Sequence, residues 1–168
     1  MNNEFFKQDA EKVALGLLGK FIFVDGKIAR IVETEAYYDD KDPASRACQN
    51  GDLRETMLMG GGTILVYGVH NNWLVNIVTG DSNDAQAVLI RAVEPLNFSS
   101  RCNGPGLLTK GLGIDKNFHK SFVNDKIVIR KSNLGRFKIG RSNRIGVKED
   151  LKKPLRFFIE GNKHVSGK

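Results

Sequence analysis

Two glutamates, Glu33 and Glu35, lie in a segment that reads as a β-strand and runs straight into aromatic residues. Side chains alternate between the faces of a strand, so both carboxylates are expected on one face, with Thr34 on the other. Tyr37 and Tyr38 follow directly, before an acidic loop that contains a proline. A carboxylate at a strand end, beside aromatic rings, is suited to activating water next to a flat, stacked ligand.

Arg91 interrupts the apolar run AVLIRAVEP, which is expected to form another strand. Burying an arginine is costly unless the guanidinium is paired, so Arg91 is expected to meet a carboxylate or to line a polar site. Leu89 and Val93 would share its face of the strand, which favours a partly buried side chain over an outward-facing one.

A glycine-rich turn, NGPG, precedes a short helical segment that ends near Gly113. Backbone N–H groups at the start of a helix can bind phosphate, so Gly104, Gly106 and the nearby Lys110 are candidate phosphate contacts. Such turns also begin many helices that bind nothing, and that interpretation stays open. For Trp73 we expect core packing rather than stacking on a base.

Other catalytic templates are missing from the sequence. It contains no P-loop lysine motif, no dinucleotide-binding glycine fingerprint and no nucleophile elbow. The three histidines lack close metal-ligand spacing, and Cys48 and Cys102 are expected to be reduced thiols. We therefore expect neither a cofactor nor a metal ion.

The elements that must position these residues are mostly strands. A helix is expected over residues 9–18, capped by Asp9 and ended by Gly19. A hairpin is expected over residues 21–35, because Asp25-Gly26 suits a type I′ turn. Further strands are expected at residues 87–93, 127–129 and 155–159, and a loop at residues 39–54.

A second hairpin is expected over residues 63–79, with Asn71-Asn72 at its turn. That turn would place Tyr67 opposite Asn76. Together these elements predict an α+β fold: a compact single domain with a curved, mainly antiparallel β-sheet core, a protruding hairpin and surrounding short helices.

The composition is that of an ordinary globular chain, expected to form one domain over residues 1–168. The net charge is +7, but residues 1–100 hold 9 Lys and Arg against 14 Asp and Glu, while residues 101–168 hold 17 against 5. A basic half of this density favours a polyanionic partner, with a solvated surface as the alternative. No secretory signal or membrane-spanning run is visible, so we expect no membrane partner and a cytoplasmic location, nucleoid-associated in a prokaryote or nuclear in a eukaryote.

Several motifs occur in one order along the chain: IVETEAY, DPASR, GGTILVY, AVLIRAVEP, NGPG with LGI, and KPLRFFIEG. In this combination the sequence resembles the alkyladenine (3-methyladenine) DNA glycosylases, the family that includes the mammalian alkylpurine enzyme, from about Ala10 to Gly167. The resemblance implies a monofunctional enzyme of base-excision repair. Such an enzyme flips a damaged purine out of double-stranded DNA and hydrolyses its N-glycosidic bond with water, without a catalytic lysine or a metal.

The resemblance also implies roles for individual residues. Glu35 matches the family's water-activating glutamate, Arg91 an arginine that helps to position the water, and Ile145 a residue whose carbonyl holds it. Tyr37 matches a ring that stacks on the flipped base, and Asn76 an asparagine at the pocket floor that disfavours guanine. The DNA-binding surface of an expected monomer would include His70, Asn71, Gly104, Gly106, Lys110, Arg141 and Arg144.

Two positions depart from the family pattern. Arg46 stands where the family commonly has a histidine that touches the base, and a guanidinium should accept a cationic alkylpurine less well than a neutral lesion such as hypoxanthine or an etheno adduct. The hairpin carries one tyrosine, Tyr67, where the family usually has two. We expect Tyr67 in the base pocket, with Val69, His70 or Asn71 wedged into the DNA; the alternative is that Tyr67 itself is the wedge.

Two other functions remain open at this point. Arg46 and the short hairpin also allow a non-catalytic nucleic-acid module, either a damage sensor or an RNA-binding domain on the same fold. A glycosidase that acts on sugars through Glu33 and Glu35 is a third possibility, but it leaves the basic half of the chain unexplained.

Overall fold

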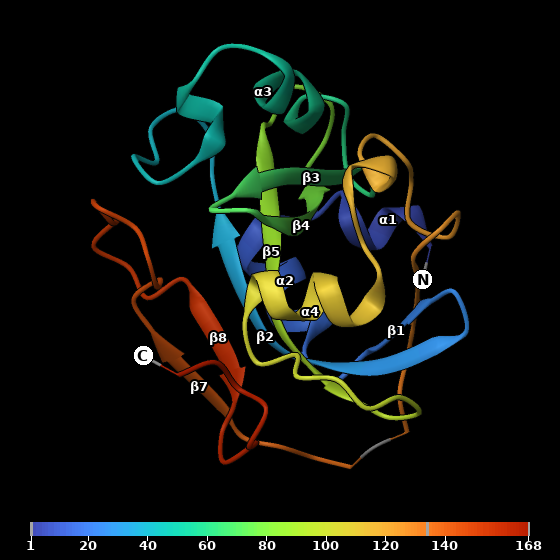
Figure 1. Cartoon of the computed structure of the whole chain (residues 1–168). Coiled ribbons are helices and arrows are strands. Elements are labelled where there is room, and N and C mark those ends of the chain that lie inside the picture. The colour runs from blue at the N-terminus through green and yellow to red at the C-terminus, as the bar shows by residue number, and fades with distance from the viewer. Residues whose placement is uncertain (1, 134, 168) are drawn as a thin grey trace.

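A computed structural model describes residues 2–133 and 135–167. It is an α+β domain built on one curved, eight-stranded sheet, as the sequence predicts (Figure 1). The helices are α1 (Asn3–Phe6), α2 (Ala10–Leu17), α3 (Asp52–Met57) and α4 (Pro105–Leu112). The strands are β1 (Phe21–Val24), β2 (Lys27–Tyr37), β3 (Ile64–Val69), β4 (Asn72–Thr79), β5 (Gln86–Pro95), β6 (Val128–Arg130), β7 (Ile139–Ser142) and β8 (Arg156–Ile159).

The strands run in the order β3-β4-β5-β2-β1-β6, and β8 pairs with both β2 and β7. Strand β2 is at the centre: β5 follows one of its edges, while β1 and then β8 follow the other. All these strand pairs are antiparallel. In Figure 1, β7 and β8 lie beside β2, so the C-terminal part of the chain meets the strand that carries the two glutamates.

Local sequence signals account for the first elements. Asp9 caps α2 by accepting a hydrogen bond from the backbone N–H of Glu11, and Gly19 follows the helix with a φ of 77°. Asp25 and Gly26 both have positive φ, as a type I′ turn requires, so the expected β1–β2 hairpin is confirmed.

The second hairpin forms with a different register from the expected one. Its turn residues are His70 and Asn71, which have φ values of 45° and 61°. Tyr67 therefore pairs with Leu74, and the expected pairing with Asn76 is wrong. Asn76 pairs with Leu65 and lies diagonally from Tyr67 on the same face.

Three further expectations need correction. The loop expected over residues 39–54 contains a 3-10 helix at Arg46–Cys48 and the start of α3. Strand β7 had no clear apolar pattern and was not expected. Trp73 is 37% exposed rather than buried in the core.

The pairing of β2 with β5 is irregular at the glutamates. Ile31 pairs with Val93, Glu33 with Ala92 and Thr34 with Ile90, so Arg91 has no partner on β2. A bulge of this kind re-aims a side chain. Val93 consequently packs in the main core, and the expectation that it shares a face with Leu89 and Arg91 is wrong.

The two faces of the sheet differ in what covers them. On one face Thr34 donates a hydrogen bond to the Ala14 carbonyl of α2, and the main apolar core packs there. Glu35, Leu89 and Asn76 pair in a row across β2, β5 and β4, and so share the opposite face. That second face holds the candidate site.

Candidate active site

A cleft of about 600 Å³ opens on the face of the sheet opposite α2. Its walls include Tyr37, Pro43, Ala44, Arg46, Gln49, Tyr67, Val69, Leu74, Leu89, Arg91 and residues 145–149. A smaller recess lies deeper and is lined partly by Tyr37, Tyr67, Asn76 and Arg46. The structure thus brings together the residues assigned to the base pocket from distant parts of the sequence.

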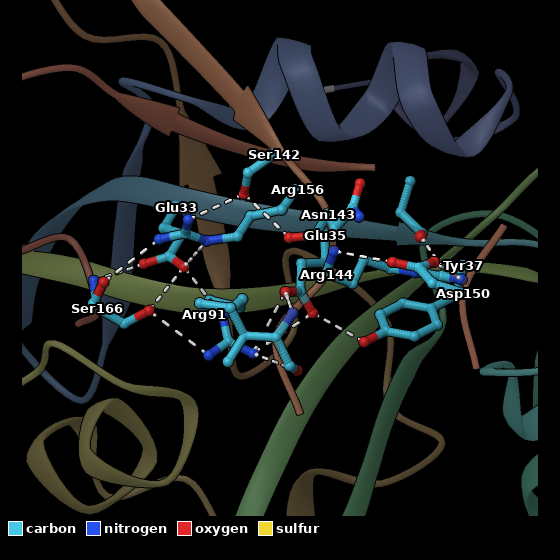
Figure 2. A network of polar contacts seen from close by, with 12 residues as sticks. Glu33, Glu35, Tyr37, Arg91, Ser142, Asn143, Arg144, Asp150, Arg156 and Ser166 are labelled. Atoms are coloured by element: carbon cyan, nitrogen blue, oxygen red, sulfur yellow. Dashed lines mark hydrogen bonds and ion pairs between the residues drawn. The ribbon is translucent and has the colours of Figure 1, made fainter. Parts of the chain in front are cut away.

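Glu35 is fully buried directly behind this cleft. Its carboxylate accepts hydrogen bonds from the backbone N–H of Ile145 at 2.8 Å and from the hydroxyl of Tyr37 at 2.8 Å. Arg91 Nη1 lies 3.4 Å from Glu35 and also 3.4 Å from the Ile145 carbonyl (Figure 2). Tyr37, Arg91 and Ile145 all line the cleft, so the residues in direct contact with Glu35 separate its carboxylate from the cleft interior.

The surroundings of Glu35 act on its acidity in opposite directions. Burial raises the pKa of Glu35 above the usual 4.5, and the Arg91 charge, the Ile145 N–H and the Tyr37 hydroxyl hold back part of that rise. Burial and the adjacent carboxylate also raise the pKa of Tyr37 well above 10. Tyr37 is therefore a neutral donor, and the raised pKa makes the ionised form of Glu35 a stronger base than an exposed glutamate.

Glu33 has a different environment although it lies on the same strand. It is fully buried and accepts hydrogen bonds from Arg91 Nε at 3.0 Å, Arg156 Nε at 2.7 Å and the backbone N–H and hydroxyl of Ser166 at 2.6 and 2.7 Å. Of its partners only Arg91 lines the cleft, whereas all three partners of Glu35 do. The two carboxylates therefore have different surroundings, which disfavours a sugar glycosidase that uses both of them at one bond.

Arg144 is not on the surface, which corrects its expected role as a DNA contact. Its side chain is buried and binds the carboxylates of Asp42 and Asp150 at 2.6 to 2.7 Å. The guanidinium carbon lies 4.5 Å from the centroid of the Tyr37 ring. Arg144 therefore supports one face of the Tyr37 ring and ties it to the loop that contains Asp42.

Arg46 lies at the junction of the cleft and the deeper recess. Its guanidinium carbon is 4.8 Å from the centroid of the Tyr67 ring. Asn76, 3% exposed, donates through Nδ2 to the Leu65 carbonyl at 3.3 Å. Arg46 and Asn76 thus both line the recess, and their roles in a base pocket stay predictions.

The start of α4 packs against the hairpin beside its tip. His70 and Asn71 are exposed at the tip, and a side-chain carbon on Gly106 would lie 2.6 Å from that of Asn72. This close approach gives a packing reason for Gly106 that is independent of phosphate. Gly104 begins α4 in extended backbone, and Lys110 is exposed on the helix.

Arg141 lies on the other side of the sheet from the cleft, contrary to its expected role as a DNA contact. It pairs with Phe157, which pairs with Thr34, so its side chain shares the face of α2. There it forms an ion pair with Glu11 at 2.9 Å.

Four residues of the polar network were not identified from the sequence: Asp42, Asp150, Arg156 and Ser166. Arg156 lies in KPLRFFIEG, one of the motifs that carry the resemblance, and an arginine within an apolar strand is the same signal that singles out Arg91. Asp42 likewise lies in a motif, DPASR, but its partner Arg144 is distant in sequence. Asp150 and Ser166 lie in none of these motifs, and only the fold brings them to their partners.

Among residues 2–133 and 135–167, no group of three or more His, Cys, Asp or Glu side chains could hold a metal ion. No helix in those parts of the chain is long and apolar enough to cross a membrane. The fold thus places a buried carboxylate behind a cleft whose walls include two tyrosine rings.

Comparison with known proteins identifies the family. The family model described as methylpurine-DNA glycosylase matches residues 4–163. Proteins named "Putative 3-methyladenine DNA glycosylase" are 42% identical in Borreliella afzelii (strain PKo), covering 99% of each chain, and 36% identical in Aeropyrum pernix, covering 96% of this chain and 90% of the relative. A protein of the same name in Clostridium botulinum (strain Alaska E43 / Type E3) is 35% identical and covers 100% of this chain and 99% of the relative.

The chain therefore belongs to the methylpurine-DNA glycosylase family. It is a DNA glycosylase, a hydrolase of base-excision repair that acts on alkylated bases, and DNA is its substrate and binding partner.

Proposed function

We propose that the protein is a monofunctional glycosylase for purine lesions, which flips alkylated or deaminated purines out of duplex DNA and leaves an abasic site. The observation that carries this proposal is the set of contacts around Glu35. The buried carboxylate has one oxygen held by Tyr37 and the other by Ile145, and Arg91 contacts both Glu35 and the Ile145 carbonyl. These groups converge where a water molecule can be held between carboxylate and sugar.

In this mechanism, Glu35 takes a proton from water as the water oxygen bonds to C1′ of the deoxyribose. The bond between C1′ and the purine nitrogen breaks, and its electron pair leaves with the base. The negative Glu35 also offsets the positive charge that develops on the sugar. The proton passes from water to the Glu35 carboxylate behind the cleft, and the reaction consumes only the DNA and water.

The flipped base is proposed to lie between Tyr37 and Arg46. Arg144 already occupies one side of the Tyr37 ring, which leaves the other for the base. Arg46 repels a cationic alkylpurine but stabilises the negative charge that forms on a neutral purine as it leaves. We therefore propose a preference for neutral lesions, with hypoxanthine and etheno adducts as the leading candidates.

The protein is proposed to bind duplex DNA as a monomer, through the hairpin tip and the start of α4. Val69 is the apolar residue next to the hairpin tip. It lies two positions after Tyr67, on the same face of β3, and both residues line the cleft. An apolar side chain can enter the stack when a base is extruded. Val69 is thus our preferred wedge, flanked by His70 and Asn71 at the backbone.

The test is Glu35→Gln, assayed on duplexes that each contain one lesion, with alkali used to cleave abasic sites. Base release should fall by about 10²- to 10⁴-fold because the general base is lost, while lesion-DNA binding persists. Glu160→Gln, the same change at an exposed position, is the control and should release base at the wild-type rate.

Full activity of Glu35→Gln would refute the role of Glu35. A wild-type protein that retards lesion DNA but yields no cleaved product across the panel would instead support the non-catalytic binding module.

A further inference from the structure

We propose that Ser166 is a positioning residue for base excision: its backbone N–H and hydroxyl complete the donors around Glu33, and Glu33 in turn fixes Arg91 in the orientation that serves Glu35. This inference rests on the proposed function of Glu35. It assigns a role in the active site to the C-terminal segment, residues 162–166, which lies outside every motif that pointed to the cleft.

The first observation is how fully Glu33 is held. Four hydrogen bonds reach its two oxygens, and Ser166 supplies two of them, including the shortest, 2.6 Å from its backbone N–H. Arg91 and Arg156 supply the other two through their Nε atoms. A buried carboxylate between two guanidinium groups is stable only when its remaining lone pairs are also satisfied, and Ser166 meets that need.

The second observation is a closed ring of contacts around Arg91. Its Nε donates to Glu33 Oε1 at 3.0 Å, and its Nη2 donates to the Ser166 hydroxyl oxygen at 3.5 Å. The same hydroxyl donates to Glu33 Oε1 at 2.7 Å. Because one edge of the planar guanidinium is fixed in this ring, the opposite nitrogen, Nη1, is directed at Glu35 and the Ile145 carbonyl (Figure 2).

The third observation is that the C-terminal segment is anchored independently of the ring. Asn162 donates to Glu94 on β5 at 3.1 Å, and Val165 packs against a buried cluster that includes Val32 and Ile159. Ser166 is itself 8% exposed. These contacts hold residues 162–166 against the sheet and so position Ser166 beside Glu33.

The inference predicts that Ser166→Ala slows base release by about 10- to 100-fold under single-turnover conditions, because Arg91 loses its orientation. Lesion-DNA affinity should change by less than about twofold, since Ser166 does not line the cleft. Ser166→Thr keeps the hydroxyl and should restore most of the rate. Lys163→Ala, an exposed change in the same segment, should behave as the wild type.

A pH profile separates positioning from a general loss of structure. The Arg91 charge lowers the pKa of Glu35, so a displaced Arg91 lets that pKa rise. The acidic limb of the rate profile should then move to higher pH in Ser166→Ala and return in Ser166→Thr. An unchanged rate, or a loss that vanishes when rates are corrected for the folded fraction, would overturn the inference.

The carboxyl titration of Glu35, followed by carbon NMR with isotope-labelled glutamate, tests the same point without catalysis. If the wild-type protein released no base, the proposed function would fail, yet the Glu35 titration should still shift to higher pH in Ser166→Ala. A titration identical in both proteins would overturn the inference whatever the activity.

Discussion

At the residue scale, a few side chains separate two carboxylates that look equivalent in sequence. Glu33 is enclosed by Arg91, Arg156 and Ser166, whereas Glu35 is held by groups that line a cleft. The charge inside the cleft is also set at this scale. There Arg46 places a cation over the Tyr67 ring, at the entrance to the deeper recess.

Replacing Arg46 with histidine should favour cationic lesions. The ratio of excision rates for a cationic alkylpurine over hypoxanthine is expected to rise about tenfold in Arg46→His, because a repulsive charge leaves the pocket; tenfold corresponds to about 1.4 kcal/mol. Single-turnover excision of both lesions in matched duplexes measures the ratio. Arg136→His, at an exposed position away from the cleft, should leave it unchanged, and an unaltered ratio in Arg46→His would mean that Arg46 does not select the base.

At the element scale, one arginine holds the loop before α3 to the sheet. Asp42 accepts hydrogen bonds from the backbone N–H groups of Tyr38 and Ala44 and from both Nη atoms of Arg144. Arg144 lies more than a hundred residues away in sequence and also packs on Tyr37. The loop that carries Arg46 and the ring of Tyr37 are thus positioned by the same buried ion pair.

Asp42→Asn should lower the free energy of unfolding by about 3 kcal/mol at neutral pH, because it leaves a buried guanidinium short of one carboxylate. Burial works to raise the pKa of Asp42, but the hydrogen bonds from Arg144, Tyr38 and Ala44 outweigh it and hold the pKa below 3.8. The Asp42 carboxylate therefore stabilises the fold fully at pH values above its unfolded-state pKa, and this contribution is lost as the pH falls through the lower folded-state pKa. Urea unfolding at a series of pH values should show the two proteins converging in acid.

The control for this comparison is Asp40→Asn, which alters an exposed ion pair with Arg54. That change should cost no more than about 1 kcal/mol. An Asp42→Asn effect no larger than the Asp40→Asn effect would show that the buried pair does not hold the loop.

At the scale of the whole molecule, folding pairs several cations of the basic half with carboxylates of the acidic half. Arg144 and Arg156, from the basic half, are buried against Asp42 and Glu33 of the acidic half. On the surface, Lys120 contacts Asp52. The net charge of +7 still favours DNA, but the DNA-binding face must be defined by position around the cleft rather than by position in the sequence.

Salt dependence of DNA binding should reveal that face. Lys148 is exposed on the rim of the cleft, whereas Arg141 is exposed on the α2 side of the sheet. Lys148→Ala should lower the slope of log affinity against log salt by about one, since one phosphate contact and its released counterion are lost. Arg141→Ala should leave the slope unchanged, and equal slopes for both variants would contradict this placement of the DNA.

Local sequence was sufficient wherever one short segment contains the whole physical cause. Asp9 and Gly19 mark the two ends of α2, and Asp25-Gly26 forms the turn between β1 and β2. The ordered motifs predicted the family, and the expected hairpins and short helices predicted the α+β fold. The pairing of Arg91 with carboxylates also followed locally, because a charge within an apolar strand needs a partner.

Tertiary structure decided whatever depends on partners distant in sequence. The turn at His70-Asn71 reset the hairpin register, and a bulge turned Arg91 towards the glutamates. The burial of Arg144 and the delivery of Ser166 to Glu33 required segments separated by more than a hundred residues to meet. Sequence thus determined that a carboxylate, an arginine and aromatic rings would form a site. The fold alone decided that Glu35 is held by residues that line the cleft while Glu33 is held by Arg156 and Ser166 as well as Arg91, because burial and hydrogen bonding are set by what packs around a side chain.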